Sequence, residues 1–327
     1  MKTLSFTGLL QKINGAKRVS GCVSAVMEGR FPLEIEGCEG AFGAMLLAKI
    51  YSARPGRYFA VIPQEQDAAD FAADLASLGV PHLQFPGWGV APYRELAPLS
   101  AVFGTRVGAL ADLVMGKPGI VIISQRAFLC PLPPPDYIKS LLVPIKPGAK
   151  IDTAELSRKL VSYGYIRVPR VQLRGEFALR GEILDIFMAG EDVESDTEAA
   201  SAYRVLFDFD RVESVRRFDP LTQGGGTGKE KLEELLIRPM RELVWTDDRI
   251  EALEKNLASF NEFSDGGKAL IEELITRRGF AGEEMFYSFA FDKALTTNTS
   301  HKGTESRRKN EAFADSASSS VPSSLRV

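Results

Sequence analysis

The stretch that decides the fold is residues 162–190, SYGYIRVPRVQLRGEFALRGEILDIFMAG, together with residues 203–220, YRVLFDFDRVESVRRFDP. In the second segment, polar residues alternate with the apolar residues Tyr203, Val205, Phe207 and Phe209. Leu206 is the one apolar residue at a polar position of this alternation. A period of two with one apolar face is typical of a half-buried antiparallel strand. The pair Asp210-Arg211 then makes a tight connection to a last strand over residues 212–218. We expect a small meander with an arginine-rich outer face, suited to binding rather than catalysis.

The first segment adds three shorter runs to this meander. Residues 171–173 and 177–179 flank a turn at Arg174-Gly175-Glu176. Gly181 precedes the run 182–187 and interrupts the pattern as a bulge or a bend would. Each run is predicted to be a strand of the same sheet.

Four blocks of this region resemble the UvrA-contacting domain shared by the nucleotide-excision repair protein UvrB and the bacterial transcription-repair coupling factor. The blocks are GYIR (164–167), GEFALRG (175–181), ILDIF (183–187) and ESVRRFD (213–219). They occur in the family's order and at its spacing, and the wider resemblance spans roughly residues 30–290. It implies that UvrA is a partner of this chain.

The resemblance also implies which residues contact UvrA. UvrB uses a Tyr-x-Arg and the arginines of a Phe-Arg-x-Arg-Gly segment. Arg167 matches the first motif and Arg180 the last arginine of the second, whereas Ala178 stands where UvrB has another arginine. Phe187 closes the ILDIF block as a candidate apolar contact, with a core position as the alternative.

Arginine suits such a contact because its planar, always charged fork pairs with carboxylates in a bidentate manner. Exposed arginines near aromatic residues are typical interface anchors. The alternative for these arginines is cross-strand ion pairing with neighbouring acids, which contributes a few tenths of a kcal/mol for each pair. Residues 164–220 contain 8 arginines and 12 acidic residues, a balance that favours a protein partner over DNA. The acidic loop 191–198 is predicted to be a solvated connection, with nucleic-acid mimicry as the alternative.

Composition limits the other function classes. The 327 residues carry a net charge of −3, so any nucleic-acid contact needs a local basic patch. The three cysteines lie far apart and the chain has two histidines, which argues against a disulfide framework, a metal site and Ser-His catalysis. There is no apolar run of about 20 residues and no signal-peptide pattern, so we expect a cytoplasmic protein that does not contact a membrane.

The first part of the chain reads as an α/β domain. Apolar runs at residues 57–63, 81–85 and 120–124 alternate with helical patterns at 64–78 and 101–114, which predicts a largely parallel sheet. The run 57–63 is predicted to be fully buried.

A glycine-rich loop before the helix 44–51 has the strand, turn and helix layout of a P-loop. Its glycines are Gly37, Gly40 and Gly43. A Walker A loop places Lys and then Ser or Thr after its last glycine, but Ala44 and Met45 follow here. We expect a degenerate loop without a nucleotide cofactor, a helix N-terminus that packs on the sheet, and no catalytic residue in the chain.

Tyr93, Arg94 and Arg106 lie in a region that resembles a segment next to the DNA-engaging part of UvrB. They are candidate DNA contacts. The alternative is that the aromatic residues cover an edge of the core and that the arginines form ion pairs on a solvated face.

The predicted fold class is thus α/β: a P-loop-like parallel-sheet domain without a functional Walker A, with an inserted small α+β antiparallel-sheet domain. The predicted parts are a UvrB-like α/β domain (1–130), a UvrA-interaction domain (131–223), a return to the first domain that is incomplete (224–294) and a disordered, serine-rich tail (295–327). The tail reads like an early chain end, as in a truncated reading frame.

The function predicted from these features is a non-catalytic adaptor of transcription-coupled nucleotide excision repair. Complete members of the family bind RNA polymerase and translocate on DNA through domains that this sequence lacks, because it contains neither GxxxxGK[ST] nor a DExH-type box. The alternatives are a UvrB-like ATP-dependent repair enzyme and a DNA-binding accessory protein.

Overall fold

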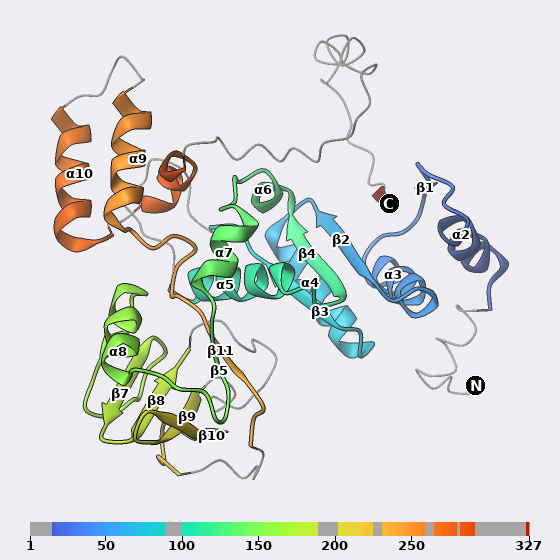
Figure 1. Ribbon diagram of the computed structural model, residues 1–327. Helices are drawn as coiled ribbons and strands as arrows, with labels where there is room; N and C mark the ends of the chain where they lie inside the picture. The colour runs from blue at the N-terminus through green and yellow to red at the C-terminus, as the bar shows by residue number, and fades with distance from the viewer. Residues whose placement is uncertain are drawn as a thin grey trace. The chain divides into compact units, whose positions relative to one another are not determined.

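The computed structural model describes residues 15–88, 100–188, 202–224, 231–258, 265–279, 282–291 and 325–326. The described residues form two compact units (Figure 1). Unit 1 takes its residues from 1–84, 118–125 and 297–327, and unit 2 takes its residues from 85–117 and 126–296. The division into four parts proposed from the sequence stays a prediction.

Unit 1 is an α/β unit built on a three-stranded sheet. Its elements are α2 (Lys17–Met27), β1 (Glu34–Ile35), α3 (Ala41–Ala53), β2 (Arg57–Ile62), α4 (Glu65–Ser77), β3 (His82–Phe85, which ends at the unit boundary), β4 (Gly119–Ser124) and β12 (Leu325–Arg326). The sheet order is β2-β4-β3, and β2 pairs with β4 in parallel. The predicted parallel pairing of these two apolar runs is therefore confirmed.

Burial within this sheet follows strand position. The central strand β4 is buried along its whole length, as its apolar run predicts. Strand β2 lies at the edge, and its Ala60 and Ile62 pack under α3 and α4. Phe59 and Val61 point to the other side and are 54% and 43% exposed, so the prediction of a fully buried strand was wrong for β2. Because an edge strand is flanked by a strand on one side only, part of its surface stays open to water.

Unit 2 contains the predicted meander. Its elements are α5 (Ser100–Val114), α6 (Gln125–Phe128, which begins at the unit boundary), α7 (Pro135–Leu141), β5 (Val143–Ile145), α8 (Thr153–Ser162), β6 (Ile166–Arg167), β7 (Glu176–Arg180), β8 (Ile183–Phe187), β9 (Ala202–Asp208), β10 (Arg211–Arg217), β11 (Leu235–Ile237), α9 (Asp247–Ala258), α10 (Asp265–Arg277) and the 3₁₀ helix η2 (Glu283–Ala290).

The five-stranded sheet has the order β10-β9-β8-β7-β6 and is antiparallel except for the parallel pair β6–β7. A separate antiparallel pair, β5 with β11, sets Val143 opposite Ile237. A mixed α/β architecture with both parallel and antiparallel sheets is thus confirmed.

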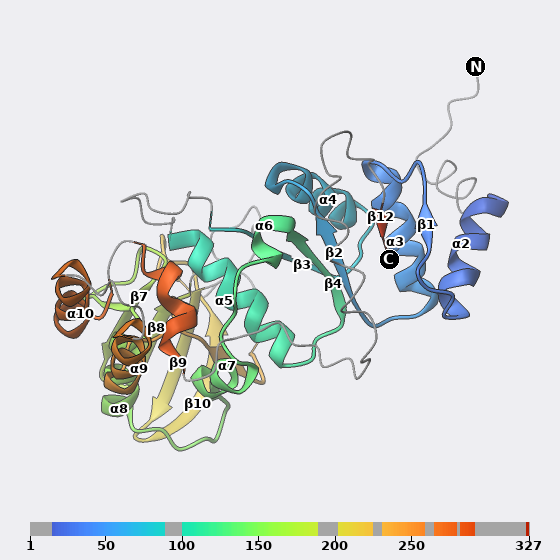
Figure 2. The same cartoon turned by 90° about the horizontal axis from the view of Figure 1, so that it is seen from above.

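One face of the five-stranded sheet packs on α8, which lies along it in Figures 1 and 2. The alternating residues predicted for β9 do this packing: Tyr203, Val205 and Phe207 are all buried in that core. The opposite face has a smaller apolar core made by Val171, Ala178, Phe187, Ala202 and Phe218. A third core joins α9, α10 and η2 with Leu243 and Trp245.

Three details of the meander differ from the sequence prediction. Residues 171–173 form no strand; the backbone N–H groups of Gln172 and Leu173 instead donate to the Glu176 carboxylate, at 2.7 and 2.8 Å. Gly181 lies in the turn between β7 and β8, with φ of 57°, and the register irregularity lies between Val212 and Ser214. Residues 171–173 are not extended because the Glu176 side chain bonds to their backbone. Gly181 is not extended because its φ is positive.

Phe209 is the third difference. The alternation places it on the buried face, but β9 ends at Asp208 and Phe209 occupies the turn to β10. Its φ is 53° and its side chain is 85% exposed. The alternation between faces holds only along the strand, and it ends at Phe209, where the two-residue turn begins.

Several predictions concern residues outside the described ranges. These are Tyr93 and Arg94, the acidic loop 191–198, and the tail 295–327 apart from residues 325–326, which form β12 against β1.

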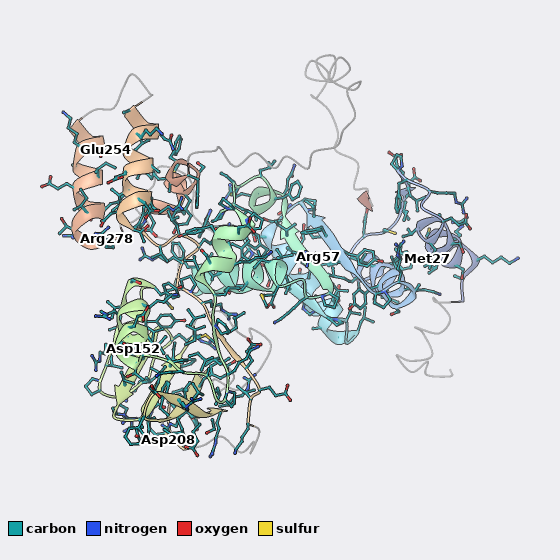
Figure 3. All side chains as sticks on the ribbon, viewed as in Figure 1. Met27, Arg57, Asp152, Asp208, Glu254 and Arg278 are labelled. Atoms are coloured by element: carbon teal, nitrogen blue, oxygen red, sulfur yellow. The ribbon has the colours of Figure 1, made fainter. Side chains whose placement is uncertain are left out.

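Helix α8 begins at a side-chain cap. Asp152 and Thr153 both carry the side-chain oxygen that N-cap positions favour. The carboxylate of Asp152 accepts hydrogen bonds from the backbone N–H groups of Ala154 (2.8 Å) and Glu155 (3.0 Å), which makes Asp152 the N-cap. Figure 3 labels this residue at the start of the helix.

We predict that Asp152→Ala lowers the melting temperature at pH 7, whereas Thr153→Ala changes it much less. The bonds from Glu155 and Ala154 hold the pKa of Asp152 below its ordinary value. A lowered folded-state pKa stabilises the fold above the unfolded pKa of about 3.9, and this contribution is lost as the pH falls below it. The difference between wild type and Asp152→Ala should therefore shrink on acidification; a difference that stays constant down to pH 2 would contradict the cap.

Candidate partner-binding site

Arg180 is held in place by a carboxylate that lies inside the sheet. Asp185 is fully buried, and its two oxygens accept from two arginines. Arg180 Nη2 donates to Oδ2 at 2.7 Å, while Arg204 Nε and Nη2 donate to Oδ1 and Oδ2 at 2.6 and 2.9 Å. The Arg180 side chain is 48% exposed, so it is oriented from within and still open to solvent. An ion pair and an accessible guanidinium therefore coexist at this residue.

Arg204 closes the same cluster from the next strand. Its guanidinium lies 5.0 Å from the centre of the Phe218 ring, and Nη1 donates to the carbonyl of Gln223 at 3.3 Å. Sequence reasoning missed Asp185. The only signal for it is an acidic residue inside the apolar block ILDIF, which has to find a cation once it is buried.

Arg167 lies on the two-residue edge strand β6 and is exposed. The strand register pairs Arg167 with Phe177, whose side chain belongs to the core under α8. Arg180 belongs to the set that includes Ala178, on the opposite face. Paired residues of neighbouring strands share a face, so the sheet does not bring Arg167 and Arg180 together on one flat patch.

Phe187 is only 5% exposed and packs among Val171, Ala178, Ala202 and Phe218. The guanidinium of Arg174 lies 4.9 Å from the centre of its ring. This burial favours the core alternative for Phe187, because a direct apolar contact needs an accessible ring. In the present conformation Phe187 supports Arg174 instead.

Exposed apolar side chains lie close to these arginines in the chain. Ile166 precedes Arg167 on β6, Leu173 lies in the loop before β7, and Leu221 accepts a hydrogen bond at its carbonyl from Arg170 Nη2 at 3.2 Å. Each of the three is exposed by more than three fifths. Apolar residues beside arginine are the composition that protein interfaces favour.

Arg106 forms an ion pair, as the alternative to a DNA contact predicted, but the predicted solvated location was wrong. It is fully buried on α5 and forms an ion pair through Nε with the equally buried Glu242. Its guanidinium lies between two rings, 4.1 Å from the centre of Phe85 and 3.9 Å from that of Trp88, and Nη1 donates to the carbonyl of Pro86 at 2.6 Å. A group enclosed in this way does not reach a DNA phosphate.

The glycine-rich loop leads into α3, which begins at Ala41. Gly37 and Gly40 have φ of 75° and 55°, and Gly43 lies in the first turn of the helix, where an added Cβ would come 3.0 Å from the carbonyl oxygen of Cys38. The preceding strand β1 pairs with β12, not with the parallel sheet. A strand of that sheet directly before the loop defines a P-loop, so the P-loop-like layout is not confirmed.

Unit 2 also contains an open cavity of about 890 Å³ between α8, α10 and residues 241–247. Three arginines line it, and each is paired: Arg241 with Glu283, Arg277 with Glu273, and Arg278 with Asp247. The described residues contain no group of three or more His, Cys, Asp or Glu arranged to hold a metal ion. Among the described helices, none combines the length and apolar character needed to span a bilayer.

Comparison with known proteins finds a family match for the part of the chain that contains the meander. Residues 143–243 match the family described as UvrB interaction domain. The chain is 27% identical over 263 residues to a transcription-repair-coupling factor of Borreliella burgdorferi, a match that covers 80% of this chain and 22% of the relative. The protein of that name from Myxococcus xanthus is 32% identical over 223 residues, and that from Escherichia coli is 25% identical over 213; each match covers 65% of this chain and 18% of the relative. The chain therefore corresponds to about a fifth of the length of these relatives.

We predict that Arg106→Ala lowers the free energy of unfolding by about 3–5 kcal/mol, because it leaves the Glu242 carboxylate buried without a cation. Urea denaturation at pH 7 measures this loss. Arg158→Ala, at an exposed arginine of α8, is the control and should change stability by less than about 0.5 kcal/mol.

The loss should depend on pH. Burial raises the pKa of Glu242, and Arg106 partly offsets this rise. A raised folded-state pKa destabilises the fold above the unfolded pKa, and the penalty disappears once the carboxyl is protonated in both states, below about pH 4. Equal stability of Arg106→Ala and Arg158→Ala at pH 7 would contradict the ion pair.

Proposed function

We propose that this chain, in which residues 143–243 form a UvrB interaction domain and which is similar to transcription-repair-coupling factors, is an adaptor module of transcription-coupled nucleotide excision repair that binds UvrA. The module is non-catalytic in this proposal. It acts in the cytoplasm, and RNA polymerase and DNA are engaged through other parts of a longer protein.

The observation that carries the proposal is the match of residues 143–243 to the interaction domain. These residues begin at β5 and extend just past β11, two strands that pair with each other. Between them lie α8 and the five-stranded sheet with its own buried core. The pairing of the entry and exit strands holds the two ends of this segment side by side.

The non-catalytic part of the proposal rests on chemistry that the sequence lacks. Ala44 and Met45 occupy the places of the Lys and the Ser or Thr of a Walker A loop. Lys49 lies more than a turn further along α3 and cannot replace a loop lysine. A UvrB-like ATPase is the second candidate, and it is favoured only by the glycine-rich composition of the loop.

We predict that UvrA binds the wild-type chain and that Arg167→Ala and Arg180→Ala each weaken binding about thirtyfold, which corresponds to roughly 2 kcal/mol. Isothermal titration of UvrA with each variant measures this change. Arg158→Ala is the matched control, because it removes an exposed arginine from α8 in the same domain.

The two substitutions also distinguish two ways in which UvrA could dock on the sheet. A partner that touches one face of the sheet should be sensitive to only one of these substitutions, and a partner that wraps around the β6 edge should be sensitive to both. Absence of binding by a folded wild-type chain would contradict the proposed function.

We predict that a non-hydrolysable ATP analogue leaves the melting temperature unchanged. A ligand at 100 times its Kd adds about 2.7 kcal/mol to the free energy of unfolding, which a thermal scan detects easily. A clear upward shift would restore the ATPase alternative. DNA binding that weakens steeply with salt would instead support the DNA-binding accessory alternative.

A further inference from the structure

Phe209 is the most exposed large apolar residue of the described chain, at 85%, and its backbone is in the left-handed region, with φ of 53°. Glycine, asparagine and aspartate adopt this conformation readily, whereas a bulky aromatic residue does so at a cost. A residue that is both strained and solvated stabilises nothing within the fold. Such an outlier directs attention to a role outside the fold.

Neighbouring groups hold the turn that presents Phe209. The Phe209 N–H donates to Glu182 Oε1 at 3.4 Å, and the carbonyl of Asp210 accepts from the N–H of Ile151 at 2.8 Å. Lys150 Nζ lies 2.9 Å from Asp210 Oδ2. The ring therefore stands on a turn that is fixed on two sides, so that binding through it would lose little conformational freedom.

The turn lies at the same end of the sheet as Arg180. Arg180 is paired with Ile183 across the β7–β8 turn, and Ile183 is paired with Leu206 near the end of β9. The N–H of Phe207 donates to the carbonyl of Glu182 at 2.8 Å, which joins the two turns directly. Strands β7 and β9 are two strand spacings apart, or roughly 10 Å. Figure 3 labels Asp208, which directly precedes Phe209, at this end of β9.

The partly buried residues Ile183 and Leu206 lie between Arg180 and the turn that carries Phe209 in the strand register. This end of the sheet, defined as the turn surface (Arg180, Ile183, Leu206 and Phe209), thus offers an aromatic ring, a partly apolar floor and an oriented guanidinium. An apolar centre with a cationic neighbour is the composition of a protein–protein anchor.

We propose that Phe209 is an anchor residue for UvrA and inserts into an apolar pocket of that partner, beside an acidic group that pairs with Arg180. This inference rests on the proposed function and extends its site to the β9–β10 turn. A nucleic-acid base is the less suitable occupant, because the Glu182 carboxylate accepts from the Phe209 N–H and Asp208 directly precedes Phe209, and both negative charges repel phosphate.

The test is titration of UvrA with the full chain and four variants, one of which is the Arg180→Ala variant described above. Phe209→Asn removes the ring but suits a positive φ, so its melting temperature should equal or exceed that of wild type while its Kd for UvrA rises about tenfold or more. Phe209→Tyr keeps the ring and should bind nearly as wild type does. Phe128→Ala removes a half-exposed phenyl ring from α6, outside the interaction domain, and is the matched control.

The results of this titration distinguish a failure of the Phe209 anchor from a failure of the proposed function. If wild type binds and Arg180→Ala weakens binding but Phe209→Asn does not, the anchor is refuted and the proposed function stands. If Phe209→Asn and Phe128→Ala weaken binding equally, the effect is not specific and the anchor is again refuted. If the folded wild-type chain does not bind UvrA, both proposals fail together.

Discussion

The buried carboxylate of Asp185 is the constraint around which the interaction domain is arranged. A charge enclosed in a sheet costs several kcal/mol unless cations and hydrogen bonds compensate it. Arg204 compensates it in a bidentate manner from β9, and Arg180 does so from β7. The same cluster extends to Phe218 and Gln223 through Arg204, so that one charge positions residues from four segments of the domain.

A second buried ion pair performs a similar task elsewhere in unit 2. Arg106 and Glu242 are separated by 136 residues in the chain, and their contact joins α5 to the segment that follows β11. The rings of Phe85 and Trp88 enclose the guanidinium from both sides. In both cases a polar pair selects which distant segments meet, since breaking either pair would leave an uncompensated charge in the interior.

The positions of the exposed arginines follow from the way side chains alternate between the two faces of the sheet. Successive residues of a strand point to opposite faces, and one face of this sheet is occupied by α8. Arg167 and Arg180 consequently lie on different faces, Arg167 on the edge strand β6 and Arg180 at the end of the sheet that carries the two turns. A partner that uses the arginines together has to approach one of these places.

The sequence by itself determined the local structure: the strands β8 and β9 from their apolar pattern and the central strand β4 from its apolar run. Four short blocks also indicated the resemblance that the match of residues 143–243 to the UvrB interaction domain family bears out. These features depend on residues within a few positions of one another. Tertiary structure alone decided that Arg106 is enclosed, that Phe187 is a core residue and that Phe209 is exposed. Burial depends on which distant segments pack against a residue, and neither periodicity nor residue type records that.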